Sequence, residues 1–256
     1  MGLEHVLDIA RADPARCALF TDMDGTIADI VDDPDSVTPI AGTAELLSEL
    51  AMAYGAVAVV SGRSVSFLDR FFAPPVELSG LYGIEHRTTE RLLIDSDALE
   101  WLPTIDQTAN DARKRFGIDA VEDKRYSLTV HYRTADASTS ESILDWAGAV
   151  GTSSGLLVRA AKMSVELHPP IKRTKGDVVG ELVSGMRAGV YLGDDCGDLP
   201  AFEQLHFLKS QGQLEAIATV VVDGDETPAE LRELATDQVS SPAEAIDLLS
   251  RFRSEA

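Results

Sequence analysis

Four short polar segments of the sequence bring together carboxylates, hydroxyls and a lysine. They are "DMDGT" with Asp22, Asp24 and Thr26, "SGR" with Ser61, "TKG" with Lys175, and "GDDCGD" with Asp194, Asp195 and Asp198. Each segment alone is typical of an ordinary turn or loop. Together they supply a nucleophile and charge neutralisation, which are the two requirements for cleaving a phosphate ester, whose own negative charge repels attack.

Asp22 is predicted to be the nucleophile, because a carboxylate can attack phosphorus and form an aspartyl-phosphate. Oxygen ligands from Asp22, Asp194 and the backbone carbonyl of Asp24 would hold Mg²⁺. This cation would bind the phosphoryl group and offset the repulsion between the neighbouring carboxylates. Lys175 and the hydroxyl of Ser61 are expected to bind the remaining phosphoryl oxygens.

Asp24 lies two residues after Asp22 and is predicted to be the general acid and base. Gly25 lets the chain turn sharply behind the pair, so that the carboxyl of Asp24 can lie on the leaving-group side. There it would protonate the departing alkoxide and then activate the water that hydrolyses the intermediate.

The pattern of the chain predicts elements that would bring these segments together. Apolar runs such as "CALFTD", "AVAVVSG", "VYLGDD" and "ATVVVD" are typical of buried strands, and amphipathic stretches between them are typical of helices. The alternation predicts an α/β fold with a parallel sheet covered by helices on both faces. Ligands of such sheets bind beyond the carboxyl ends of the strands, where the polar segments lie.

The middle of the chain has a different pattern. Two helical stretches and several runs that resemble antiparallel strands, among them "YSLTVHYR" and "SVELHP", predict a small α+β domain over residues 104–168. Residues 1–103 and 169–256 would then form the two parts of the core domain.

Charge and composition limit the classes of partner. The formal net charge of −21 argues against nonspecific binding to nucleic acid or anionic membranes. Two cysteines cannot make a disulfide framework, which favours a reducing compartment. Because no run is long enough to span a bilayer, we expect a soluble protein of the cytoplasm.

In this order, the four segments resemble the motifs of the haloacid dehalogenase superfamily of phosphotransferases, over residues 22–198. The resemblance implies a Rossmann-like core and an α+β cap of the larger (C2B) type, inserted between the second and third motifs. It also implies that Thr26 binds phosphate together with Ser61 and Lys175. Asp195 and Asp198 would lie next to the metal ligands and help to orient them, without binding the metal themselves.

The segments "VVSGRSVSFLDRFF", "LYGIEHR", "EDKRYSLTVHYR" and "VELHPPIKRTKGD" are similar to those of trehalose-6-phosphate phosphatases. This resemblance implies Mg²⁺-dependent hydrolysis of a sugar phosphate, trehalose 6-phosphate, with a trehalose-phosphate synthase as a partner. It implies that the substrate is bound by Arg63, Lys124, His131, Arg133 and Glu166. His131 and Arg133 are two residues apart, so we expect them to share one face of a strand.

The sequence departs from the family pattern in two places. Cys196 and Leu199 replace the Thr and Glu that are usual in the last motif, and Tyr82 stands where many relatives carry a His. The second departure leaves the sugar contacts near Glu85 and His86 open. Three alternatives remain: a phosphatase for another sugar phosphate, a phosphomutase, and a non-catalytic sensor of a sugar phosphate.

Overall fold

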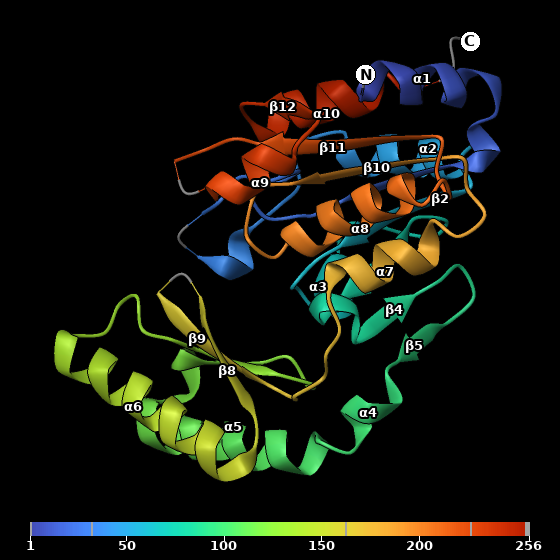
Figure 1. Cartoon of the computed structure of the whole chain (residues 1–256). Helices are drawn as coiled ribbons and strands as arrows, with labels where there is room; N and C mark the ends of the chain where they lie inside the picture. Colours follow the sequence, from blue (N-terminus) through green and yellow to red (C-terminus); the bar gives the residue numbers. More distant parts are fainter. Residues whose placement is uncertain (1, 32, 162, 226, 254–256) are drawn as a thin grey trace. The chain divides into compact units, whose positions relative to one another are not determined.

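A computed structural model describes residues 2–31, 33–161, 163–225 and 227–253. The chain divides into two compact units. The larger comprises Met1–Leu93 and Arg173–Ala256, and the smaller comprises Ile94–Lys172. The predicted α/β fold, with a largely parallel sheet and a second, smaller sheet, is confirmed (Figure 1).

An eight-stranded sheet forms the centre of the larger unit. Its order is β12 (Asp237–Val239), β11 (Ala216–Val222), β10 (Ala188–Gly193), β1 (Cys17–Thr21), β2 (Ala56–Val60), β3 (Glu77–Gly80), β4 (Glu85–Arg87) and β5 (Leu92–Ile94). The strands from β12 to β3 pair in parallel, and β4 pairs antiparallel with β3. The apolar runs expected to be strands form β1, β2, β10 and β11 at the middle of this order.

Alternate residues of the central strands enter two separate cores, because successive side chains of a strand point to opposite faces. Leu19 of β1 packs in one core with the helices α1 (Leu3–Ala12), α2 (Thr43–Ala51), α3 (Val65–Leu68) and α10 (Pro242–Ser250). Phe20 packs in the other with α7 (Lys175–Leu182), α8 (Leu199–Ser210) and α9 (Ala229–Leu234). Burial on both faces explains why these strands are continuously apolar.

Strand register brings the polar segments to one edge of the sheet. Thr21, the last residue of β1, lies opposite Leu192 of β10 and Val59 of β2. The chain therefore leaves all three strands at nearly the same level, and Asp22, Ser61 and Asp194 follow within two residues.

The smaller unit is an antiparallel sheet with helices. Its strand order is β6 (Val121–Asp123), β7 (Leu128–His131), β9 (Ser164–His168) and β8 (Leu157–Ala161), and its helices are α4 (Ser96–Leu99), α5 (Leu102–Phe116) and α6 (Ala137–Ser154). One face of the sheet is apolar and packs with α5 and α6. The unit contains residues 104–168 and extends on both sides of them; on the N-terminal side, Trp101 packs against this core.

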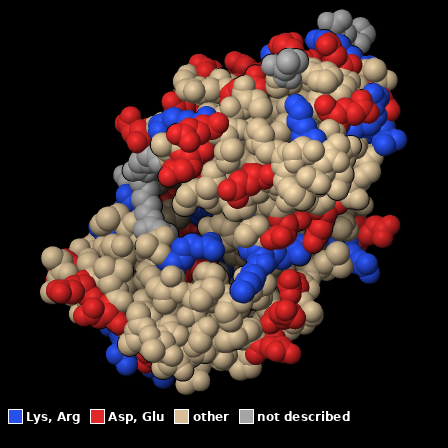
Figure 2. Space-filling model, viewed as in Figure 1, with Lys and Arg blue, Asp and Glu red and all other residues tan. Residues whose placement is uncertain are grey.

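Acidic side chains spread over much of the visible face of the larger unit, in keeping with the net charge of −21 (Figure 2). Among the described residues, no helix has the length and hydropathy that a bilayer crossing requires.

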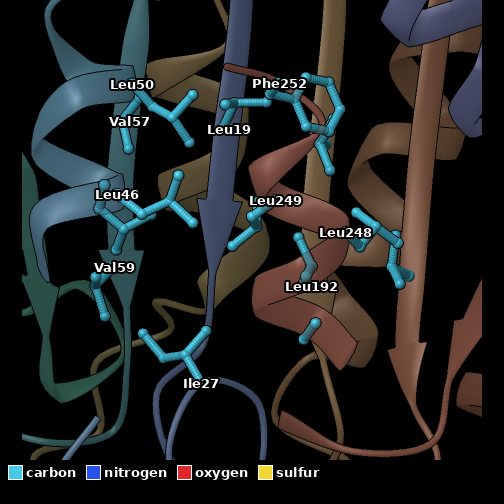
Figure 3. Close-up of a cluster of buried hydrophobic side chains, with 14 of the residues drawn as sticks. Leu19, Ile27, Leu46, Leu50, Val57, Val59, Leu192, Leu248, Leu249 and Phe252 are labelled. Atoms are coloured by element: carbon cyan, nitrogen blue, oxygen red, sulfur yellow. The ribbon is translucent and has the colours of Figure 1, made fainter. Parts of the chain in front are cut away.

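The first core gives a test of packing. Phe252 is 3% exposed and lies with Leu19, Leu249 and other side chains in the cluster of Figure 3. Its ring packs edge to face on Tyr54, with 6.1 Å between the centroids. Phe252→Ala is expected to lower the free energy of unfolding by about 3–5 kcal/mol, since the lost side chain leaves a cavity.

Urea denaturation with an unchanged slope would measure this loss. The matched control is Phe207→Ala, because Phe207 is 55% exposed and should change stability little. Equal effects of the two substitutions would contradict the packing described for Phe252.

Candidate active site

Lys175 and Asp22 meet at the carboxyl edge of the sheet. The backbone N–H of Asp22 donates to the carbonyl of Leu192, which fixes the chain directly after β1 (2.9 Å). Lys175 begins α7, and the capping box formed by Thr174 and Asp177 sets that start. The Nζ atom of Lys175 lies 3.0 Å from Oδ2 of Asp22.

Asp198 holds the other side of the lysine. Its Oδ1 accepts hydrogen bonds from Nζ of Lys175 (2.7 Å) and from the hydroxyl of Tyr191 (2.8 Å). Its Oδ2 accepts from the backbone N–H groups of Asp194 (3.0 Å) and Asp195 (3.1 Å). Asp198 is fully buried, so these four bonds fix the shape of the loop after β10.

Burial opposes the charges at this site. Burial alone would lower the pKa of Lys175, but attraction by Asp198 and Asp22 outweighs it and raises that pKa well above its ordinary value. Burial also raises the pKa of Asp22, against the opposing attraction of Lys175, and the loop carboxylates raise it further. A nucleophilic carboxylate must be ionised. The single positive charge of Lys175 does not offset the rise in the pKa of Asp22, so a further positive charge is needed at the site.

One oxygen of Asp22 shows where that charge would be bound. Oδ1 of Asp22 is buried and has no hydrogen-bond partner among the described residues. Carboxylate oxygens of Asp22, Asp195 and Asp198 lie within 4.8 Å of one another. An all-oxygen donor set beside an unpartnered carboxylate oxygen fits a hard divalent cation such as Mg²⁺.

Asp194 contacts the loop after β1. Its Oδ1 accepts from the hydroxyl of Thr26 (2.9 Å), and a Cβ atom at Gly25 would overlap its carboxylate. Burial raises the pKa of Asp194 to about 8, and repulsion from Asp198 and Asp195 contributes. Asp198 already accepts four hydrogen bonds, so its oxygens are less available to a cation than those of Asp194 and Asp195. The hydroxyl of Thr26, predicted to bind phosphate, is directed at Asp194.

Arg63, predicted to bind substrate, contacts Asp24 in the structure. Its Nε donates to Oδ2 of Asp24 (2.9 Å), and its Nη2 donates to Oδ1 (2.6 Å). Nη1 donates to the carbonyl of Pro34, and the guanidinium lies 4.4 Å from the centroid of the Phe67 ring. The predicted acid and base is thus held by a two-pronged ion pair. Ser61 is buried beside it, and its Oγ accepts from the backbone N–H of Arg63 (3.2 Å).

In the smaller unit, Glu166 lies on the polar face of the sheet. Its Oε1 accepts from the hydroxyl of Ser127 (2.9 Å), and Nζ of Lys124 lies 3.5 Å away. Glu166 is directly opposite Thr129 on β7 and Arg159 on β8. Lys124 and Glu166 are therefore brought together as one group.

The expectation that His131 and Arg133 share a strand face is wrong. β7 ends at His131, whose Nε2 lies 3.1 Å from Oε2 of Glu122. Arg133 lies in the following turn, where the N–H of Ala135 bonds to the carbonyl of Tyr132. The chain turns there because Asp136 caps α6 directly afterwards, so the strand alternation cannot continue.

Tyr191, Thr129 and Arg159 were missed by the sequence reasoning. Tyr191 carries the only hydroxyl in the apolar run "VYLG". A buried hydroxyl needs a hydrogen-bond partner, so this pattern indicates a polar side chain nearby in the fold. Thr129 and Arg159 gave no comparable signal, because their place beside Glu166 depends on strand register.

The chain is similar to known phosphatases in sequence and in fold. Residues 20–237 match the family model described as trehalose-phosphatase. A trehalose-phosphate phosphatase of Mycobacterium ulcerans is 32% identical over 252 residues, which cover 94% of this chain and 62% of that protein. One of Mycobacterium leprae is 30% identical over 230 residues, covering 84% and 53%. The chain thus spans between about half and about three fifths of the length of these relatives.

Solved structures share the fold. A trehalose-6-phosphate phosphatase related protein has a TM-score of 0.76 at 22% identity, with 91% of this chain and 95% of that chain covered. The C-terminal domain of trehalose-6-phosphate phosphatase from Candida albicans also has a TM-score of 0.76, at 19% identity, covering 98% and 96%. The C-terminal domain of a trehalose synthase regulatory protein of Candida albicans has a TM-score of 0.66 at 17% identity, with 98% of both chains covered.

Lys175→Met is expected to lower the free energy of unfolding by about 3–5 kcal/mol, because it leaves two buried carboxylates without their cation. Denaturation by urea measures the change. The control is Lys209→Met, which removes an exposed ammonium from the last turn of α8. A Lys175→Met protein as stable as the unsubstituted one would contradict the charge balance described here.

The raised pKa of Asp194 predicts how stability depends on pH. The folded state binds this proton more tightly than the unfolded state, so without metal stability falls as pH rises from 3.8 to about 8. Saturating Mg²⁺ should remove this loss, since the cation stabilises the ionised carboxylate. Melting temperatures across this pH range, with EDTA or with Mg²⁺, test the effect. Asp194→Asn should flatten the metal-free profile; an identical slope in that variant would refute the assignment.

Proposed function

Because the chain belongs to the trehalose-phosphatase family, we propose that it hydrolyses trehalose 6-phosphate to trehalose and phosphate with the help of Mg²⁺. The observation that carries the proposal is the environment of the Asp22 carboxylate. Asp22 directly follows β1, its Oδ2 lies 3.0 Å from Nζ of Lys175, and its Oδ1 is buried without a hydrogen-bond partner among the described residues. A binding module needs no buried carboxylate that keeps one oxygen without a hydrogen-bond partner.

The reaction has two steps. An oxygen of Asp22 attacks phosphorus, and the bond from phosphorus to the sugar oxygen breaks, while that oxygen takes a proton from Asp24. Water then attacks the phosphorus of the aspartyl-phosphate and gives a proton to Asp24. The bond from phosphorus to Asp22 breaks, which releases phosphate and restores both carboxyl groups.

Charge on the phosphoryl oxygens is offset by the residues around Asp22. Nζ of Lys175 and the hydroxyl of Ser61 are proposed to bind two of these oxygens, with Thr26 close to them. The carboxylates of Asp22 and Asp194 and the carbonyl of Asp24 would hold Mg²⁺, with Asp195 as a further acidic group. When bound, the cation supplies electrostatic stabilisation of the phosphoryl group and of the ionised nucleophile.

Recognition of the sugar is assigned to the polar face of the smaller unit. Glu166 is a fixed acceptor because Ser127 and Lys124 both hold it. Oγ1 of Thr129, directly opposite, is buried without a partner among the described residues, so it has hydrogen-bonding capacity for a sugar hydroxyl. His131 and Arg133 are proposed to complete this surface.

A non-catalytic sensor is the second candidate, because a regulatory protein of Candida albicans shares this fold. Fold alone does not separate the two functions. The buried pairing of Lys175 with Asp22 and Asp198 favours the enzyme. A synthase that makes the sugar phosphate is the class of partner that would supply its substrate.

Asp22→Asn is expected to lower kcat for trehalose 6-phosphate by at least about a thousandfold, since the amide cannot become the nucleophile. Phosphate release measures this, with circular dichroism to show that the variant folds. Asp145→Asn, an exposed change on α6, is the control. Normal turnover by a folded Asp22→Asn protein would exclude the mechanism, and a wild-type protein inactive on a panel of sugar phosphates would favour the sensor.

Glu166→Ala and Arg133→Ala are each expected to lower kcat/KM for trehalose 6-phosphate by at least about tenfold, or about 1.4 kcal/mol of transition-state binding. Hydrolysis of para-nitrophenyl phosphate should change much less, because it has no sugar to recognise. Both substrates are assayed on each variant, with the exposed Arg91→Ala as control. Equal losses on both substrates would show that these residues have a structural role only.

A further inference from the structure

The turn after β3 has an unusual backbone. Leu81, Tyr82 and Gly83 have successive φ angles of 50°, 58° and 101°. For residues other than glycine the left-handed region costs roughly 1–2 kcal/mol each. Such strain persists only where the surroundings hold it, and it clusters at functional sites.

This turn is bonded to the loop that carries Ser61. The N–H of Tyr82 donates to the carbonyl of Ser61 (3.1 Å), and the N–H of Leu81 donates to the carbonyl of Arg63 (2.9 Å). Both bonds hold the turn against the loop at Ser61 and Arg63, on either side of Gly62.

The ring of Tyr82 lies between two loops of the site. A Cβ atom at Gly62 would lie 2.8 Å from the hydroxyl oxygen of Tyr82 and 2.9 Å from Cζ. A Cβ atom at Gly197 would lie 3.4 Å from Cε1 of the same ring. Gly197 belongs to the loop after β10 (residues 194–198), which we call the metal loop, and its N–H donates to Oδ1 of Asp195 (2.7 Å). The ring thus lies against the backbone of the loop after β2, which carries Ser61, and against that of the metal loop.

Gly83 brings the turn against the third segment. A Cβ atom there would lie 2.7 Å from Cγ2 of Val178 and 2.8 Å from Nε of Arg173. Val178 is in α7, about one turn after Lys175. One three-residue turn therefore contacts the segments that carry Ser61, Lys175 and Asp195.

We propose that Tyr82 is a positioning residue, whose ring sets the spacing between the loop of Ser61 and the metal loop of Asp194 and Asp195. This inference rests on the proposed phosphatase function. Tyr82 acts through the phosphoryl and metal groups, so its effect is the same for any phosphate ester. The hydroxyl oxygen and ring carbons lie against Gly62, and a ring carbon lies against Gly197, so the ring is the part of the side chain that reaches both loops.

Three variants separate these features. Tyr82→Phe keeps the ring, Tyr82→Ala removes it, and Tyr82→Asn removes it while suiting the left-handed backbone. The readouts are kcat for trehalose 6-phosphate and for para-nitrophenyl phosphate, and the Kd of Mg²⁺ by calorimetry without substrate. Phe207→Ala, an exposed aromatic deletion, is the control.

Tyr82→Phe is expected to match the wild type within about twofold in every readout. Tyr82→Ala and Tyr82→Asn are expected to lower kcat for both substrates and to weaken Mg²⁺ binding, each by about tenfold, as loss of groups that orient metal ligands does. Tyr82→Asn decides the question if Tyr82→Ala does not fold.

Three results would overturn the inference: a loss confined to trehalose 6-phosphate, a Tyr82→Phe protein as impaired as Tyr82→Ala, or unchanged Mg²⁺ affinity in the folded ring-deletion variants. A wild-type protein that hydrolyses no phosphate ester would refute the proposed function alone. In that case the Mg²⁺ titrations still decide the role of Tyr82.

Discussion

A single ammonium group, buried between two carboxylates, is the interaction on which the site depends. Nζ of Lys175 lies 3.0 Å from Asp22 and 2.7 Å from Asp198, and all three side chains are almost inaccessible to water. Removing such charges from water is costly, and only close pairing offsets the cost. The ends of β1 and β10 and the start of α7 must therefore meet at this point for the core to remain stable.

The pairing is incomplete, and that incompleteness suits the proposed chemistry. Lys175 is one positive charge among the carboxylates of Asp22, Asp194, Asp195 and Asp198. Burial raises the pKa values of Asp22 and Asp194, so a divalent cation is what would keep both ionised. The same deficit would make binding of metal and of a phosphate ester mutually supportive: the cation neutralises the acids, and the ester receives the cation's remaining charge.

Much of this arrangement could be predicted from the sequence. The strands of the central sheet are continuous apolar runs, and polar residues after parallel strands must converge at one edge. The sequence could not predict which polar side chains contact one another. One of these contacts is the ion pair of Arg63 with Asp24, which depends on how the flanking loops fold. β7 ends at His131, two residues before Arg133, because the cap of α6 follows shortly after. Tyr82 adopts a left-handed backbone that no sequence pattern of non-glycine residues indicates.

The role of Asp22 as the nucleophile can be tested by trapping the covalent intermediate. The protein would be mixed with trehalose 6-phosphate and Mg²⁺, quenched in acid within one turnover, digested and mapped by mass spectrometry. We expect a phosphoryl group on the peptide that contains Asp22, formed only with Mg²⁺ and removed by hydroxylamine, as an acyl phosphate would be. A phosphoryl group on another residue, or none while phosphate release continues, would contradict it.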